Sequence, residues 1–435
     1  MGKYQGYDKY KDSGVEWLGD IPNHWEVKRF KFSVYLINNK IEAENSNLTY
    51  MGLEHIESWT GKRIEDENAS SEGIGSHFLP NDVLFGKLRP YLAKVYLSEI
   101  EGLASTEALV LRCKNDIYPK FLKYYILSRD FINIVDSSTF GAKMPRASWD
   151  FICNLFFTFP PLDEQEKIAR FLDYKTKQID ELIAKKETLI EKLDEKRTSL
   201  ISHAVTKGLD VNVPMKDSGI EWLGEIPKHW KRTVFKYYFD IQLGKMLQNE
   251  PQSTNDDEIS YLKAIHVRWD KVDIYDLPKM WASPKDREKY SVKNGDLLIC
   301  EGGEVGRTAL LKGLQEDCII QNALHRVRPL SQSSVEYLDY LMRHIADTGW
   351  FEILCNKSTI SHLTSEKLGA LALPLPPLHE QQKIAEYLDQ KTAQIDEQKT
   401  KIQQAIDLLK EYRTALITNA VTGKIDVRKI PIPKI

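Results

Sequence analysis

The sequence lacks the segments that would place a chain in a membrane or on a secretory route. No apolar run approaches the ~20 residues that a membrane-spanning helix needs, and residues 1–14 are polar, without the apolar core of a signal peptide. The chain has only five cysteines, and no two of them form a Cys-x-x-Cys pair, which argues against a disulfide framework or a zinc site. We therefore expect a cytoplasmic protein without a membrane segment or a bound metal.

Motifs for catalysis are also lacking. The chain contains no phosphate-binding loop, no His-Glu-x-x-His pair and no Asn/Asp-Pro-Pro-aromatic methyltransferase motif. The segment Gly302–Arg307 is rich in glycine, but Glu304 stands where a dinucleotide fingerprint needs its second glycine. We interpret this segment as a turn between strands, and we expect no catalytic residue and no cofactor on this chain.

An excess of positive charge is missing as well. The chain has 60 Lys and Arg against 63 Asp and Glu, which gives a net charge of −3. Proteins that bind nucleic acid through bulk electrostatics are usually basic. Any nucleic-acid surface must therefore be local, and help from a partner subunit is implied.

What the sequence does contain is an internal duplication. Residues 11–25, KDSGVEWLGDIPNHW, return at 216–230 as KDSGIEWLGEIPKHW, and residues 160–181 return at 376–397 with the shared pattern PPLxEQxKIAxxLDxKTxQIDE. The segments in between, 31–159 and 236–375, share almost no continuous sequence. A duplicated frame with two dissimilar inserts suits a protein that reads two targets better than an enzyme with one active site.

The second repeated segment opens a long amphipathic helix in each half. Apolar residues recur at heptad spacing from Asp163 to about His203 and again from Glu380, with prolines before each start and a glycine after each end. At 1.5 Å per residue each helix is roughly 60 Å long. The spacing predicts an antiparallel coiled coil, although each helix could instead lie on its own domain. The predicted seam consists of Leu172, Ile179, Leu182, Leu189, Leu193, Leu200, Leu388, Ile395, Ile402, Leu409 and Leu416.

Each insert has β-type runs broken by turns, which indicate a mixed α/β domain. Residues 81–97 match 295–311, which aligns Asp82 with Asp296 and Lys94 with Arg307. The predicted fold is α+β: two mixed α/β domains joined by two long antiparallel coiled-coil helices, with an internal pseudo-two-fold repeat. The expected boundaries are 1–159 (first domain), 160–210 (first helix), 211–375 (second domain) and 376–435 (second helix and tail). The tryptophans expected to pack where helix meets insert are Trp17, Trp25, Trp222 and Trp230.

Small cationic loops are the candidates for a nucleic-acid surface. Residues 85–95 and 140–149 carry lysine and arginine but no carboxylate. Such side chains bond guanine edges or clamp phosphates, although any single one is more often a surface charge. We expect them in matching turns of the two inserts. The candidate DNA-binding residues are Lys87, Arg89, Tyr91, Lys94, Lys143, Arg146, Lys245, Lys263, Arg268, Arg307, Arg326 and Lys357.

The order of these segments resembles the specificity (S) subunit of type I restriction-modification systems. SGVEWLGDIPNHWEVKRFK, a dissimilar insert, FPPLDEQEKIARFLD and a long helix ending in ISHAVTKGLD, all repeated, cover essentially the whole chain. The resemblance implies two target recognition domains, each reading one half of a split asymmetric site in double-stranded DNA. It implies that the helices set the spacing and dock two methyltransferase subunits, which carry S-adenosylmethionine. Restriction and translocase subunits would supply the chemistry that needs ATP and Mg.

Two other functions stay open at this point. A coiled-coil scaffold that binds proteins would show no DNA preference. An enzyme with a cryptic nuclease site, suggested only by Asp296 and Glu301 without a completing Glu-x-Lys, would cleave DNA in a metal-dependent reaction.

Overall fold

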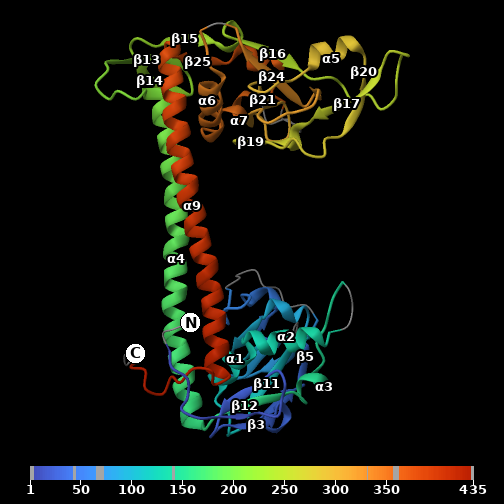
Figure 1. The fold of residues 1–435 in the computed structure, drawn as a ribbon, viewed down its shortest axis with the longest axis vertical. Coiled ribbons are helices and arrows are strands. Elements are labelled where there is room, and N and C mark those ends of the chain that lie inside the picture. Colours follow the sequence, from blue (N-terminus) through green and yellow to red (C-terminus); the bar gives the residue numbers. More distant parts are fainter. Residues whose placement is uncertain are drawn as a thin grey trace. The chain divides into compact units, whose positions relative to one another are not determined.

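The computed structural model describes residues 4–42, 46–64, 73–139, 143–330, 332–355 and 362–432. The chain divides into two compact units, residues 1–187 with 402–435 and residues 188–401. Two long helices, α4 (Leu162–Lys207) and α9 (Leu378–Val421), contribute residues to both units (Figure 1). Among the described residues, no helix is both long enough and apolar enough to cross a membrane.

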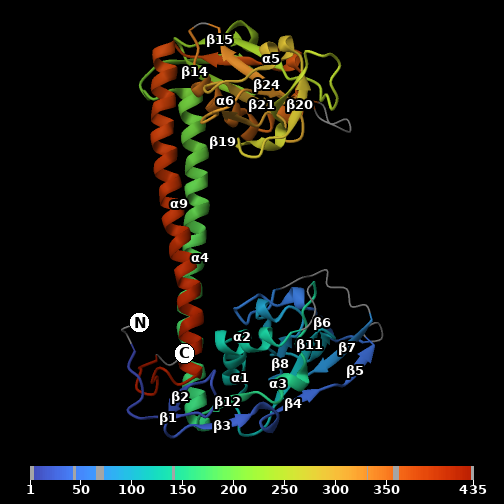
Figure 2. The same cartoon turned by 45° about the vertical axis from the view of Figure 1, so that its right-hand side comes forward.

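The first unit holds a mixed α/β domain with two four-stranded sheets (Figure 2). The first sheet has the order β4 (Val34–Ile37), β11 (Ala108–Cys113), β8 (Val83–Gly86) and β9 (Val95–Leu97). The second has the order β5 (Lys40–Glu42), β7 (Ile74–Phe78), β10 (Gly102–Ser105) and β6 (Thr49–Met51). Two further pairs are β1 (Tyr10–Asp12) with β2 (Asp20–Pro22) and β3 (Glu26–Arg29) with β12 (Phe156–Phe159). The helices are α1 (Pro119–Ile126), α2 (Arg129–Ser137) and α3 (Trp149–Ile152).

The second unit holds a second mixed α/β domain. Its main sheet has the order β16 (Phe239–Leu243), β24 (Leu324–Pro329), β21 (Leu297–Cys300) and β22 (Thr308–Leu310). A three-stranded sheet has the order β20 (Lys279–Ala282), β17 (Asp257–Leu262) and β23 (Cys318–Ile320). Three pairs follow: β13 (Met215–Ile220) with β14 (Leu223–Pro227), β15 (Lys231–Val234) with β25 (Ala372–Leu375), and β18 (Val267–Arg268) with β19 (Lys271–Val272). The helices are α5 (Pro284–Tyr290), α6 (Val335–Asp347), α7 (Trp350–Leu354) and α8 (Ser365–Ala370).

The main sheets of the two domains correspond strand by strand. Both are antiparallel, and β8 lies next to β11 as β21 lies next to β24. Asp82 precedes β8 and accepts hydrogen bonds from Arg112 Nε (2.8 Å) and Nη2 (2.7 Å) on β11. Asp296 precedes β21 and accepts the same pair from Arg328 on β24, at 2.6 and 2.7 Å. The two domains therefore share one fold, and the predicted fold class is confirmed.

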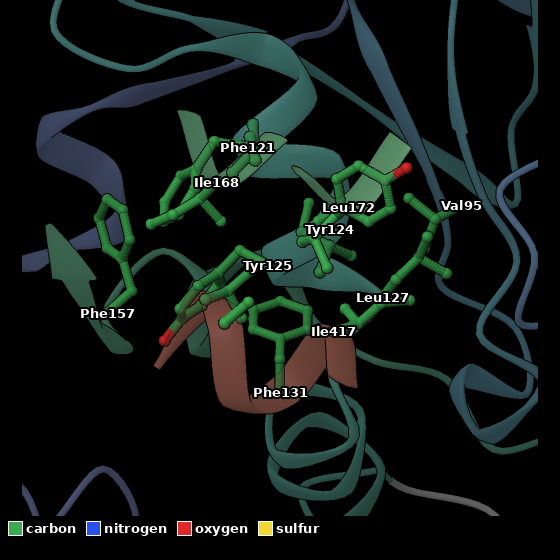
Figure 3. Close-up of a cluster of buried hydrophobic side chains, with 14 of the residues drawn as sticks. Val95, Phe121, Tyr124, Tyr125, Leu127, Phe131, Phe157, Ile168, Leu172 and Ile417 are labelled. Carbon is green, nitrogen blue, oxygen red and sulfur yellow. The ribbon is translucent and has the colours of Figure 1, made fainter. Parts of the chain in front are cut away.

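Large aromatic side chains form the core of the first unit (Figure 3). Phe121 and Tyr125 of α1 pack in one cluster with Ile168 and Leu172 of α4 and with Ile417 of α9. Each of these five residues is 1% exposed or less. Because fully burying a side chain of this size contributes roughly 1.5–3 kcal/mol, this cluster fixes the first domain to both helices.

The tryptophans of the first repeated segment pack as predicted. Trp25 and Trp230 are fully buried in the cores of the first and second unit. Trp17 and Trp222 are partly buried against the same two cores. Each repeated segment therefore pins its domain to the helices of its own unit.

Helices α4 and α9 run antiparallel within each unit. In the first unit Thr158, just before α4, donates a hydrogen bond to the carbonyl of Val421 at the end of α9 (2.7 Å). In the second unit Tyr337 donates to the carbonyls of Val205, near the end of α4, and of Pro374, just before α9 (3.1 and 3.3 Å). The predicted antiparallel direction is confirmed inside each unit.

The seam between the helices differs from the prediction. Leu172, Ile179, Leu193, Leu388, Ile395 and Leu416 are buried as expected, and Leu200, Ile402 and Leu409 are partly buried. Leu182 and Leu189, however, are 44% and 47% exposed, so their assignment to the seam is wrong.

The error has a physical reason, because the second buried row lies four residues after the first rather than three. Thr176 follows Leu172 and Thr392 follows Leu388, and both threonines are buried. Each hydroxyl donates to the carbonyl one turn earlier, at 2.7 Å to Leu172 and 2.8 Å to Leu388, so a polar residue can be buried there without an unpaired group. A prediction from hydropathy alone chose the leucines three residues on, Leu182 and Leu189, over the more polar residues four residues on. The buried row four residues on also includes Ile406, Arg197 and Arg413.

Candidate nucleic-acid interface

The two cationic loops of the first domain meet in space. The backbone N–H of Lys87 donates to Glu107, and the carbonyl of Lys87 accepts from Ala147, both at 2.9 Å. The N–H of Arg89 donates to Pro145 at 2.8 Å, and Leu88 and Arg146 form a β-bridge. We call residues 87–91 and 143–147 the cationic loop pair. It brings together five of the predicted residues: Lys87, Arg89, Tyr91, Lys143 and Arg146.

The side chains of the cationic loop pair differ in availability. Arg146 donates through Nε and Nη2 to Glu107, at 3.0 and 3.2 Å, so a carboxylate from outside the two loops partly neutralises it. Within the described part of the chain, Lys87, Arg89 and Lys143 have no ion pair and no side-chain hydrogen bond. Arg89 and Lys143 are exposed, and Tyr91 is 44% exposed beside them. Free cations next to an exposed ring can contact phosphates and stack on bases.

The loop of the second domain that corresponds to the Lys87 loop contains acidic residues. The N–H of Glu301 donates to Ala323 (2.9 Å) and its carbonyl accepts from Leu363 (2.8 Å), which repeats the two backbone bonds of Lys87. Glu301 therefore stands where the first domain has Lys87, and Glu304 lies in the same loop. The expectation of cations in matching turns is wrong at this position. The reading of Gly302–Arg307 as a turn is confirmed, because it joins the antiparallel strands β21 and β22.

Lys94 and Arg307 form the same intramolecular contact in the two domains. Lys94 Nζ donates to the carbonyl of Leu53 (2.6 Å), and Arg307 Nη2 donates to the carbonyl of Ala264 (3.0 Å). Arg307 Nη1 also pairs with Glu304 at 2.7 Å. The alignment of these two residues is thus confirmed, but their cations are engaged inside the domains, which contradicts their assignment as DNA contacts.

Two further candidates of the second domain are engaged in the same way. Arg326 is 6% exposed and donates to the carbonyls of Ser291 (2.6 Å) and Lys289 (3.2 Å), and burial lowers its pKa. Lys245 pairs with Asp286 at 2.9 Å, and its side chain is only 13% exposed. Both side chains hold the domain together rather than face outward.

Three predicted residues of the second domain remain. Arg268 is exposed and Lys263 is half-buried, and neither has a side-chain partner among the described residues. Lys357 lies outside the described residues. Sequence reasoning missed two exposed apolar side chains in this part of the chain: Ile265, between Lys263 and Arg268, is 68% exposed, and Tyr275 is 75% exposed. Ile265 lies in a short 3-10 helix, and the apolar run around it gave no sign that it is exposed.

The acidic residues do not assemble a metal site in the described ranges. No group of three or more His, Cys, Asp or Glu there could hold a metal ion. Both carboxylate oxygens of Asp296 accept from Arg328, at 2.6 and 2.7 Å. Asp296 therefore forms a structural ion pair and does not combine with Glu301 in a nuclease site.

Comparison with known proteins then decides the family. The profile of the type I restriction modification DNA specificity domain matches residues 77–192 and 279–407, which together make up more than half of the chain. The chain belongs to this family. The two matches fall one in each half, as the internal duplication requires.

Relatives named as type I specificity subunits match all or part of the chain. The MjaVIII specificity subunit of Methanocaldococcus jannaschii is 25% identical over 444 residues, which covers 94% of this chain and 95% of that one. The EcoDI specificity subunit of Escherichia coli is 27% identical over 188 residues, 40% of this chain and 42% of the relative. These relatives favour DNA specificity over the protein scaffold and over an enzyme.

Two solved structures share the fold. A chain from a type I restriction-modification system matches with a TM-score of 0.71 at 19% identity and covers 92% of this chain and 98% of that one. The HsdS subunit of Thermoanaerobacter tengcongensis matches with a TM-score of 0.56 at 20% identity, covering 93% and 98%. At these identities the likeness concerns the fold alone.

Proposed function

We propose that this chain selects the DNA target of a type I restriction-modification complex, and that each domain reads one half of a bipartite, asymmetric site in double-stranded DNA. One observation carries the proposal: two domains of one fold present opposite charge at the same loop. Lys87 and Arg89 occupy this loop in the first domain, and Glu301 and Glu304 occupy it in the second. Lysine and arginine donate to guanine edges, whereas glutamate accepts from cytosine N4. Both carboxylate oxygens of Glu304 already accept from Trp269 (2.6 Å) and Arg307 (2.7 Å). Glu301, whose carboxylate lies 3.5 Å from His362 Nδ1, is therefore the proposed base contact of the second domain. Two different half-sites follow from this difference.

The remaining parts of the complex belong to partners. The net charge of −3 leaves little bulk attraction for DNA, so the chain would bind tightly only as part of an assembly. Two methyltransferase subunits docked on α4 and α9 would supply S-adenosylmethionine chemistry, and restriction and translocase subunits would supply ATP- and Mg-dependent steps. We propose no cofactor on this chain itself.

The test uses the chain assembled with its methyltransferase subunits. Lys87→Ala and Arg89→Ala should each change DNA binding at the half-site of the first domain in one of two ways. Glu301→Ala tests the half-site of the second domain in the same manner. A base contact predicts a loss of about 1–3 kcal/mol and relaxed preference at one base position. A phosphate contact predicts uniformly weaker binding and a salt slope that is smaller by about one.

The matched control is Lys9→Ala, which removes an exposed cation that lies outside both domains' loops and outside α4 and α9. It should leave affinity, salt dependence and methylated sequence unchanged. If the loop variants also methylate the wild-type sequence with wild-type affinity and salt slope, the reading surface lies elsewhere on the domains.

A further inference from the structure

One buried arginine ties the first domain to the helices of its unit. Arg413 on α9 is 5% exposed and uses three nitrogens. Nε donates to Asp180 on α4 (2.9 Å), while Nη1 and Nη2 donate to the backbone carbonyls of Trp59 (2.8 Å) and Thr60 (3.0 Å) in the domain. A planar guanidinium holds all three acceptors in fixed directions, which a lysine cannot do.

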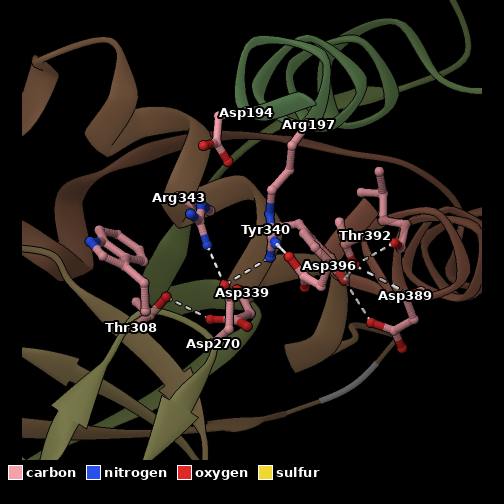
Figure 4. Close-up of polar contacts among 12 residues, drawn as sticks. Asp194, Arg197, Asp270, Thr308, Asp339, Tyr340, Arg343, Asp389, Thr392 and Asp396 are labelled. Atoms are coloured by element: carbon pink, nitrogen blue, oxygen red, sulfur yellow. Dashed lines mark hydrogen bonds and ion pairs between the residues drawn. The ribbon is translucent and has the colours of Figure 1, made fainter. Parts of the chain in front are cut away.

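The second unit contains the same device. Arg197 on α4 is 9% exposed and donates through Nη1 to Asp396 on α9 (2.6 Å). Its Nη2 donates to Asp270 of the second domain (2.8 Å), and Arg343 of α6 donates to the same carboxylate oxygen (2.7 Å; Figure 4). One arginine again joins both helices and the domain.

The two arginines are repeats of one another. Arg197 and Arg413 occupy the same position of the duplicated helix, as do Asp180 and Asp396. Their acceptors in the domains also correspond, since both Trp59 (φ 65°) and Asp270 (φ 68°) adopt the left-handed conformation that is uncommon for such residues. Each arginine stands on the helix that follows the other domain in the sequence, so each domain is held by the opposite half of the duplication.

In each domain, further hydrogen bonds connect the segment that binds the helix arginine to the loop that carries the proposed base contacts. In the first domain the N–H of Trp59 donates to the carbonyl of Ala93 (3.2 Å), and the N–H of Ala93 donates to Pro90 (2.8 Å), directly beside Arg89 and Tyr91. In the second domain the indole N–H of Trp269, next to Asp270, donates to Glu304 (2.6 Å). Only two or three contacts therefore separate each helix arginine from the equivalent loop.

We infer that Arg197 and Arg413 are positioning residues that fix the angle of each recognition loop on the helix pair, and that they thereby set the spacer length between the two half-sites. This inference rests on the proposed function. Neighbouring base pairs of B-DNA lie about 3.4 Å apart along the helix axis. A domain that can tilt by that distance would accept a spacer one base pair longer or shorter, while its own base contacts would be unchanged.

The experiment assembles the chain with its methyltransferase subunits and measures methylation of a library in which both half-sites and the spacer vary. Arg413→Met and Arg197→Met should keep each half-site sequence but lower the preference for the correct spacer, over spacers one base pair off, by at least ten-fold. Both variants are expected to fold, because Lys62 still pairs with Asp180 (2.8 Å) and Arg343 with Asp270 (2.7 Å). The matched control is Arg287→Met, whose ion pair with Asp257 (2.9 Å) joins α5 to β17 within the second domain.

The outcomes separate the possible failures. An unchanged spacer preference in both variants would overturn the positioning role, even if their melting temperatures fall. If a methionine variant does not assemble, Arg413→Lys keeps the charge without the three-way geometry and should still broaden the spacer preference; an unbroadened preference would again refute the role. If the wild-type complex itself shows no bipartite preference, the proposed function fails rather than this inference.

Discussion

The revised helix seam makes a sharp prediction about two leucines of α4 that look alike in the sequence. Leu172 is fully buried in the core of the first unit, whereas Leu182 is 44% exposed. Truncating a buried leucine to alanine typically costs about 2.7–5 kcal/mol, so we expect Leu172→Ala to destabilise the first unit by that amount. Leu182→Ala should change its stability by no more than about 0.5 kcal/mol.

The assay must report on the first unit separately, because a chain with two units need not unfold in a single step. Hydrogen exchange of the amides in α1 meets this need, since Phe121 and Tyr125 pack in the same core as Leu172. Leu172→Ala should accelerate exchange of the most protected amides of α1 about 100-fold or more. If Leu182→Ala accelerates that exchange as much as Leu172→Ala does, the seam described above is wrong.

Two further predictions concern the domains. The pKa of Asp339 is raised to about 6, chiefly by desolvation and against a hydrogen bond from Thr308. The folded state then holds this proton more tightly than the unfolded chain, so stability should fall as pH rises from about 4 to about 6, by about 1.4 kcal/mol per pKa unit at most. Between pH 4 and pH 6 the melting temperature of Asp339→Asn should fall less than that of the wild type. If the variant and the wild type show the same pH dependence, the raised pKa of Asp339 is refuted. Separately, exchanging residues 31–159 for those of a relative should change one half of the methylated sequence, whereas a change in both halves would contradict independent reading.

The repeats allowed much of the fold to be predicted, because a duplicated sequence must place its copies in equivalent surroundings. The alignment of Asp82 with Asp296 is confirmed by identical bidentate pairs with Arg112 and Arg328. The alignment of Lys94 with Arg307 is likewise confirmed by their shared contact with a backbone carbonyl. The sequence therefore showed which positions of the two domains are equivalent, even where it did not show what the residues at those positions do.

The candidate site was harder to predict, because the availability of a cation depends on neighbours that are distant in the sequence. Arg146 meets Glu107, and Arg326 is buried against the carbonyls of Ser291 and Lys289. A local count of charges sees none of these contacts. The same limitation applies to Thr176, whose hydroxyl can be buried because it donates a hydrogen bond to the carbonyl of Leu172 in its own helix.

The two arginine contacts also indicate how one frame can hold dissimilar domains. Arg413 is bound on the domain side by two backbone carbonyls, which any residue at positions 59 and 60 provides. Arg197 is bound there by the side chain of Asp270, which Arg343 of the same domain also holds. The first arrangement places little constraint on the sequence of the insert, whereas the second requires a particular carboxylate. A repeated arginine can therefore serve both domains, because its N–H groups donate to either kind of oxygen, and the inserts remain free to differ in their reading loops.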